Sequence, residues 1–108
     1  MKKHRIVLTS LVLIISIFAL SACSKATKYD GLTIKEGVLQ VAMEIGYSPF
    51  EYFDVDGKTP IGFDVQLAKL IADELGLKVE YVDTAWDGIF AGLNINKYDA
   101  VISAVTIT

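Results

Sequence analysis

Acidic side chains are the main chemical resource of this chain. Its 108 residues include thirteen aspartates and glutamates but a single histidine, His4, and a single cysteine, Cys23. The chain beyond Cys23 therefore lacks the side chains of a histidine general base and of a histidine or thiolate zinc site. It also lacks the glycine-rich loop with a lysine that binds nucleotide phosphates. Carboxylates, hydroxyls and aromatic rings remain as the candidate functional groups.

Three polar residues, Glu44, Ser103 and Thr106, lie at the carboxyl ends of apolar runs. If those runs are parallel strands, the three side chains meet at the edge where open α/β sheets bind ligands. Tyr47 and Trp86 offer aromatic faces over which an ammonium can sit, for about 0.5–2 kcal/mol. Plain structural roles are the alternative for all five residues, as core aromatics, a strand hydroxyl or a solvated strand end.

The segment from Asp54 to Lys58 overlaps the opening of an EF-hand calcium loop. With Asp54 as position 1, position 12 should be a bidentate glutamate but is Val65, and Gly57 falls at position 4 instead of 6. Aspartate and glycine together are typical of a tight turn. We therefore expect a hairpin turn here, and no metal or other cofactor.

The N-terminal 22 residues have the organisation of an export signal. A basic start is followed by an almost wholly apolar run over residues 6–20. That run is shorter than the roughly 20 residues that cross a bilayer as a permanent helix. A retained membrane anchor is the alternative interpretation.

The tetrad Leu20-Ser21-Ala22-Cys23 closes this region. A single cysteine cannot form an internal disulfide. The tetrad resembles the bacterial lipobox, in which the cysteine is lipidated and becomes the mature N-terminus. We expect a lipoprotein signal peptide at residues 1–22 and a lipid anchor on Cys23 at the outer face of the cell membrane. An unmodified thiol after an ordinary cleavage site is the alternative.

Residues 23–37 are polar and without an apolar period, which predicts a tether between the anchor and a folded body. Without residues 1–22 the chain carries seven basic and thirteen acidic side chains. That balance argues against nucleic acid as a partner, because nucleic-acid affinity depends on basic contacts to phosphates.

The segment from Gly62 to Gly76 is the clearest helix signal. Asp64 is the expected N-cap, and Gly76 the expected residue after the C-terminus. Apolar side chains recur at helical spacing and predict one buried stripe. Its expected members are Phe63, Leu67, Leu70, Ile71 and Leu75.

Strand-like runs at residues 38–43 and 78–82 flank this helix, which predicts a βαβ unit with parallel strands. A short extended piece is expected at residues 50–53. A second helix is expected after Trp86, with Asp87 as its cap. The apolar run over residues 100–105 is typical of a strand covered on both faces. The order β, β, α, β, α, β predicts an α/β layer structure.

Four segments, in this order, resemble the bacterial extracellular solute-binding proteins of family three, the receptors of polar amino-acid ABC importers. They are VAMEIGYSPFEY, GFDVQLAKLIADELG, TAWDGIFAGLNINKYDA and VISAVTIT. The resemblance covers residues 38–108 and implies a periplasmic-binding-protein-like fold, in which two lobes close on a ligand. These residues would form an incomplete first lobe, and an importer permease would be the partner.

The resemblance also implies an amino-acid site. Glu44 would face the ligand, Tyr47 and Trp86 would flank it, and Ser103 and Thr106 would hold its ammonium and carboxylate. Such a ligand needs both acceptors and donors, because each unpaired charge in a closed cleft costs several kcal/mol. Ala104 occupies a position that is often glycine in the family.

One departure from the family pattern lies at the end of the chain. In the family, an arginine follows VTIT within a few residues and binds the ligand carboxylate as a bidentate partner. Thr108 is the last residue here. We therefore expect a truncated first lobe, without the arginine, the hinge strands and the second lobe, that binds amino acids poorly by itself.

Other functions remain open on the same fold. Some relatives are periplasmic dehydratases acting on prephenate-like acids, and others are sensor or wall-lytic modules. The lipobox favours a receptor, because an anchor keeps a binding protein near its permease, and a receptor is not an enzyme. A small standalone structural lipoprotein is a third possibility and requires that the chain fold by itself.

Overall fold

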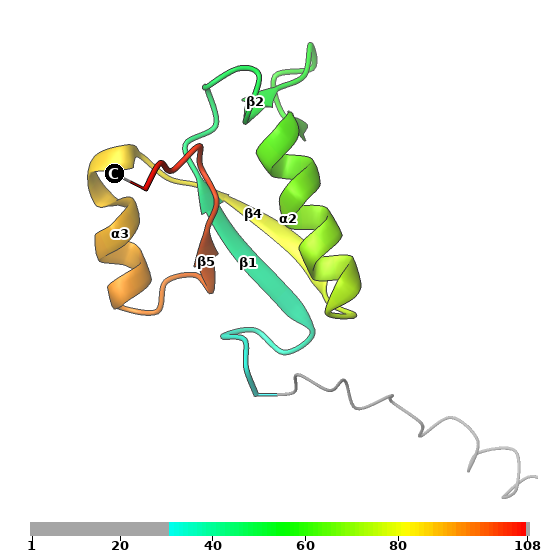
Figure 1. Ribbon diagram of the computed structural model, residues 1–108, viewed down its shortest axis with the longest axis vertical. Helices are drawn as coiled ribbons and strands as arrows, with labels where there is room; N and C mark the ends of the chain where they lie inside the picture. Colours follow the sequence, from blue (N-terminus) through cyan, green and yellow to red (C-terminus); the bar gives the residue numbers. More distant parts are fainter. Residues whose placement is uncertain (1–30, 108) are drawn as a thin grey trace, which may run out of the picture.

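The structure, a computed structural model, describes residues 31–107 (Figure 1). The expected signal peptide, the expected lipidation site Cys23 and most of the expected tether lie outside these residues. Neither helix in the described part is long and apolar enough to cross a membrane.

Strand β1 (Val38–Met43) is the centre of the main sheet. It pairs in parallel with β4 (Lys78–Asp83) on one side and with β5 (Ala100–Val101) on the other. The bounds of β1 and the parallel βαβ unit match the sequence prediction. A three-stranded parallel sheet with helical crossovers is the expected outcome, since parallel neighbours cannot be joined by a tight hairpin.

Helices α2 (Phe63–Glu74) and α3 (Trp86–Asn94) lie on opposite sides of β1 (Figure 1). Alternate side chains of β1 point to the two faces of the sheet. Val41 and Met43 pack in a cluster with α2, whereas Ala42 packs with Ile89 of α3 and with Tyr98. The fold is therefore a three-layer α/β arrangement.

The last apolar run differs from its prediction. Pairing with β1 ends soon after Val101, with a final bond from the Ile102 N–H to the Ala42 carbonyl at 3.1 Å. Ala104 then adopts a left-handed conformation, with φ of 46°. The prediction of a strand through Val105 was wrong, because the chain turns away from the sheet at Ser103.

A small antiparallel sheet, β2 (Tyr52–Phe53) and β3 (Pro60–Ile61), lies beside the start of α2. The turn between them is the hairpin expected at Asp54 to Lys58. Two differences concern its bounds: the extended piece predicted from Phe50 begins only at Tyr52, and β3 was not predicted because it is two residues long and begins with proline.

The start of α2 is stabilised by main chain instead of by a side-chain cap. The Phe63 and Asp64 N–H groups donate to the carbonyls of Pro49 and Phe50, at 3.1 and 2.9 Å. Gly62 occupies the N-cap position with φ of 127°, a conformation essentially restricted to glycine. The prediction of Asp64 as the N-cap was therefore wrong, because the preceding loop already satisfies these donors.

The end of α2 agrees with the prediction. Gly76 has φ of 69°, and its N–H donates to the Asp73 carbonyl at 3.0 Å. The Leu77 N–H donates to the Ala72 carbonyl at 2.8 Å. This pair of bonds is the Schellman motif.

The buried face of α2 is not the predicted stripe. It consists of Val65, Ala68 and Ala72, together with Asp64. Four members of the predicted stripe, Phe63, Leu67, Leu70 and Ile71, are exposed, Phe63 and Leu70 by more than 60%. The fifth, Leu75, is partly buried against the core, as expected. Two alanines at i and i+4 let the helix approach the sheet closely, so small side chains occupy the interface in place of the large ones.

Helix α3 begins one residue earlier than expected. Trp86 is its first residue, and Ala85 occupies the N-cap position, so Asp87 is not the cap.

At the other edge of the fold, the Ile34 N–H donates to Asp99 at 2.8 Å and Lys35 pairs with Glu80 at 2.7 Å. The last residues of the expected tether thus contact the folded body.

Candidate ligand-binding site

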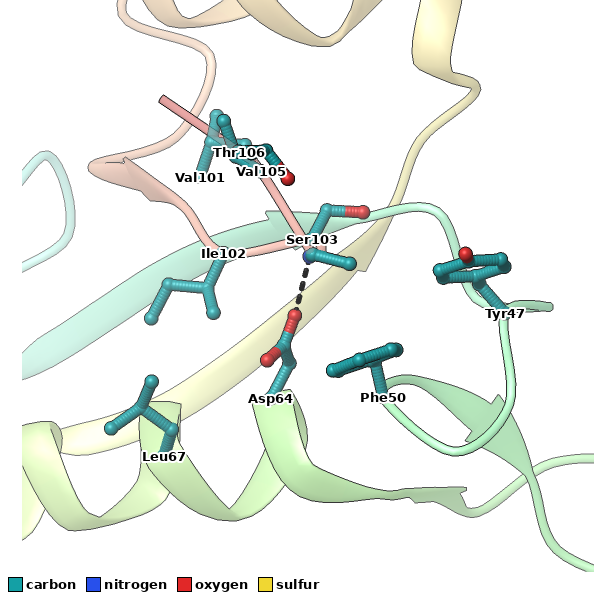
Figure 2. A pocket seen from close by; sticks show the side chains of 10 residues that line it. Tyr47, Phe50, Asp64, Leu67, Val101, Ile102, Ser103, Val105 and Thr106 are labelled. Atoms are coloured by element: carbon teal, nitrogen blue, oxygen red, sulfur yellow. Dashed lines mark hydrogen bonds between the residues drawn. The ribbon is translucent and has the colours of Figure 1, made fainter. Parts of the chain in front are cut away.

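An open pocket of about 500 Å³ lies past the carboxyl ends of β1 and β5, next to the first turns of α2 (Figure 2). Its lining residues come from three segments: the loop after β1, the start of α2 and the chain from β5 onwards. They are Tyr47, Phe50, Asp64, Leu67, Val101, Ile102, Ser103, Ala104, Val105 and Thr106. This is the edge where parallel α/β sheets bind ligands.

Aromatic rings form one side of the pocket. The rings of Tyr47 and Phe50 stack with centroids 5.7 Å apart and planes 14° from parallel. Two backbone bonds between Tyr47 and Glu51, at 2.7 and 3.0 Å, close the loop that carries both rings. Tyr47 is 59% exposed, so its ring is available to a ligand.

The opposite side is the corner at Ser103 and Ala104, where the chain leaves the sheet. The Ser103 hydroxyl donates to Oε1 of Glu51 at 2.7 Å and accepts the Glu44 N–H at 3.0 Å. The Ala104 N–H donates to Oδ2 of Asp64 at 2.5 Å, the bond drawn in Figure 2. Three hydrogen bonds, one buried and two partly buried, therefore fix this corner to three other segments of the chain.

Glu44 and Trp86 lie beside the pocket, outside its lining. Oε1 of Glu44 accepts the backbone N–H of Trp86 at 3.2 Å, which places a carboxylate at the N-terminus of α3. That position is favourable because the helix dipole is positive there. The Trp86 ring meets Phe90 edge-on, with centroids 5.4 Å apart.

Three of the five residues predicted for the site, Tyr47, Ser103 and Thr106, thus line one pocket. Glu44 and Trp86 contact each other, and Glu44 also contacts Ser103 through its main chain. Their roles toward a ligand remain predictions.

Sequence reasoning missed several residues here. Phe50, Asp64 and Leu67 line the pocket, and Glu51 supports it from beneath. The signal for Glu51 was available, since it is a carboxylate in the short apolar stretch Phe50 to Phe53. Burial raises the pKa of Glu51 above its usual value of 4.5. Residues 31–107 hold no cluster of three or more acidic, histidine or cysteine residues suited to a metal ion.

A parallel α/β sheet with a pocket at its carboxyl edge is typical of proteins that bind a small ligand. Residues 39–108 match the family described as bacterial extracellular solute-binding proteins, family 3. The chain belongs to this family. Its fold is that of part of a lobe of the periplasmic amino-acid-binding proteins, and the family consists of extracellular solute-binding proteins.

Similar proteins support this membership. The L-cystine-binding protein TcyA of Bacillus subtilis is 40% identical over 91% of this chain, which spans 41% of TcyA. The arginine-bound domain 1 from TmArgBP is 43% identical with a TM-score of 0.64, over 67% of this chain and 56% of that domain. The ancestral amino-acid-binding protein AncCDT-1, a precursor of cyclohexadienyl dehydratase, is 49% identical with a TM-score of 0.64, over 67% of this chain and 31% of that protein.

Proposed function

We propose that this chain is part of the substrate-binding lipoprotein of an amino-acid ABC importer, and that it captures a polar amino acid outside the cytoplasmic membrane. The observation that carries the proposal is the pocket at the sheet edge, where Tyr47, Ser103 and Thr106 come together. TcyA and TmArgBP, whose names state L-cystine and arginine as ligands, support an amino acid as the ligand class.

The proposed ligand is a zwitterion, and the pocket together with Glu44 beside it offers both kinds of partner. One oxygen of Glu44 accepts the Trp86 N–H, and its second oxygen can accept from a ligand cation. The Tyr47 ring offers a cation–π face. The Thr106 hydroxyl can donate to a carboxylate. An arginine from a longer version of the protein would supply the bidentate carboxylate contact that the family pattern implies.

Membrane attachment through Cys23 belongs to the same proposal. Several acyl chains on one cysteine suffice for stable anchoring, since a single chain holds a protein only marginally. An anchored receptor delivers its ligand to a permease from a short distance.

Calorimetric titration with a panel of amino acids tests the proposed function. The protein to use is this chain extended by the remaining part of TcyA, so that a second lobe is present. We expect micromolar binding of at least one polar amino acid and none of D-glucose as a control solute. If no amino acid binds to the extended protein while TcyA itself binds L-cystine, the proposed function is wrong.

The 108-residue chain alone is the second protein to titrate with the same panel of amino acids. We predict millimolar or weaker binding, because losing one charged partner costs about 2–5 kcal/mol. The arginine-bound domain 1 from TmArgBP is a single domain with its ligand, and this chain matches only 56% of it. Micromolar binding by the chain alone would show that the site is complete within it.

A dehydratase is the second candidate. The observation in its favour is the similarity to AncCDT-1, a precursor of cyclohexadienyl dehydratase. Incubating the extended protein with prephenate and measuring loss of the cyclic diene by ultraviolet absorbance separates the two functions. Turnover without amino-acid binding would favour the enzyme, and binding without turnover the receptor.

A further inference from the structure

Two acidic residues at the pocket are almost completely buried. Glu51, just before Tyr52 of β2, is 1% exposed, and Asp64, in the first turn of α2, is 5% exposed. The ion pairs in the described part of the chain are Lys35 with Glu80 and Lys69 with Asp73, so neither buried acid has a cationic partner there. Burying two carboxylates without a cation is costly unless one of them is neutral.

Each acid holds one residue of the corner at the pocket. Oε1 of Glu51 accepts the Ser103 hydroxyl at 2.7 Å, and Oδ2 of Asp64 accepts the Ala104 N–H at 2.5 Å. The second oxygen of Glu51, Oε2, is buried without any hydrogen-bond partner among the described residues. A carboxylate oxygen in that situation is unfavourable, but a protonated one is a donor that can use the neighbouring acid as its acceptor.

The groups acting on Glu51 favour its neutral form. Burial raises the pKa of Glu51 most, and the Ser103 hydrogen bond lowers it. The negative charge of Asp64 on α2, the hydrogen bond that only a protonated Glu51 can donate to Asp64, and the charge of Glu44 after β1 each raise the pKa of Glu51 further. The groups identified as acting on Glu51 include no lysine or arginine.

We propose that Glu51 carries a proton on Oε2 in the folded protein and donates it to the Asp64 carboxylate, and that this pair positions Ser103 and Ala104 at the pocket. The proton makes the pair a single negative charge in place of two. Glu51 acts through Ser103, so it is a positioning residue without ligand contact. The importance of this positioning for ligand binding rests on the proposed function, whereas the existence of the protonated pair is independent of it.

The pH dependence follows from the direction of the shift. Because the pKa of Glu51 is raised in the folded state, the folded protein holds more protons than the unfolded chain from about pH 4.5 upwards. The contribution of Glu51 to stability is therefore complete below pH 4.5 and is lost as pH rises through the folded-state pKa. Glutamine keeps an acceptor for Ser103 and a donor for Asp64 but does not titrate.

Thermal unfolding followed by circular dichroism tests the pair on the full 108-residue chain in neutral detergent, from pH 4 to pH 8. We expect the Tm of Glu51→Gln to equal that of the natural chain near pH 4 and to exceed it increasingly above pH 4.5. The exposed Glu74→Gln on α2 is the matched control and should show no such increase. A Glu51→Gln protein that is less stable at every pH, or differs by a constant amount, overturns the proposal.

Hydrogen exchange of the Ala104 amide, measured by NMR, tests the positioning role. We expect Glu51→Ala to exchange this amide at least tenfold faster, and Glu51→Gln to restore the natural rate. If Glu51→Ala fails to fold, the comparison of Glu51→Gln with the natural chain decides: faster exchange in Glu51→Gln contradicts the proposal. Neither measurement uses a ligand, so a chain that binds no amino acid would refute the proposed function while leaving these results intact.

Discussion

Glu44 joins three parts of the candidate site at the scale of a single residue. Its N–H donates to Ser103, and its Oε1 accepts from the first N–H of α3 at Trp86. It is nevertheless an exposed residue, so its carboxylate is accessible to a ligand. In the proposed function, the main chain and Oε1 of Glu44 have structural roles, and its second oxygen contacts the ligand.

This division makes Glu44→Gln an informative change. Glutamine Oε1 can still accept the Trp86 N–H, so the fold should persist while the charge is lost. We expect binding of L-arginine to the TcyA-extended protein to weaken at least tenfold, about 1.4 kcal/mol. L-citrulline, the neutral isostere of arginine, is the matched ligand, and its affinity should change much less. An unchanged dissociation constant for L-arginine in calorimetry would remove Glu44 from the site.

Helix α2 connects fold and site at the scale of elements. Its buried face of small residues packs on β1, and its first turn contributes Asp64 to the pocket corner. The Tyr81 hydroxyl of β4 donates to the Val65 carbonyl at 2.9 Å, which fixes the helix along the sheet. The loop carbonyls of Pro49 and Phe50 hold its N-terminus beside the aromatic pair.

Gly62 is where that loop and α2 meet most closely. A Cβ at Gly62 would collide with the Phe50 carbonyl oxygen, and its φ of 127° is essentially closed to alanine. We expect Gly62→Ala to lower the free energy of unfolding by at least about 1–3 kcal/mol, measured by urea denaturation.

Gly88→Ala on α3 is the control for this change. A Cβ there meets no atom within 4 Å, and alanine is the better helix former by roughly 1 kcal/mol, so this variant should be at least as stable as the natural chain. Equal stability of the two variants would show that the close approach of Gly62 to the Phe50 carbonyl is not needed for the stability of the fold.

At the scale of the whole molecule, the folded body is one part of a larger predicted arrangement. The chain spans 41% of the length of TcyA. At the other end, Ile34 and Lys35 attach the last residues of the expected tether to Asp99 and Glu80. An anchor at Cys23 would therefore be about ten residues from the body.

The Cys23→Ser variant tests this anchor. Serine cannot take the lipid, so we expect the protein to leave the membrane fraction after signal cleavage, as measured by fractionation and immunoblotting. Ser24→Ala, next to the cysteine, is the control and should remain with the membrane. A cleaved Cys23→Ser protein that stays membrane-bound contradicts the lipoprotein prediction.

The sequence alone determined those features that depend on neighbouring residues. The alternation over Val38–Met43 predicted β1 with its bounds, because strand formation follows local side-chain type. Gly76 predicted the end of α2, because only a residue that tolerates positive φ can close a Schellman motif. The length of the segment between β1 and β4 predicted their parallel pairing, and the four motifs predicted the family.

Only the tertiary structure decided which groups face each other. Helical periodicity cannot tell which apolar face of α2 meets the sheet, and the close approach allowed by Ala68 and Ala72 selected the smaller one. Asp64 has the residue type of an N-cap, but the Pro49 and Phe50 carbonyls already serve that helix end. Its carboxylate instead accepts the Ala104 N–H, at the point where the chain has left the sheet and the strand predicted through Val105 has ended. Glu51 and Asp64 are thirteen positions apart, and their proximity depends on how the loop after β1 folds against α2, which no local pattern encodes.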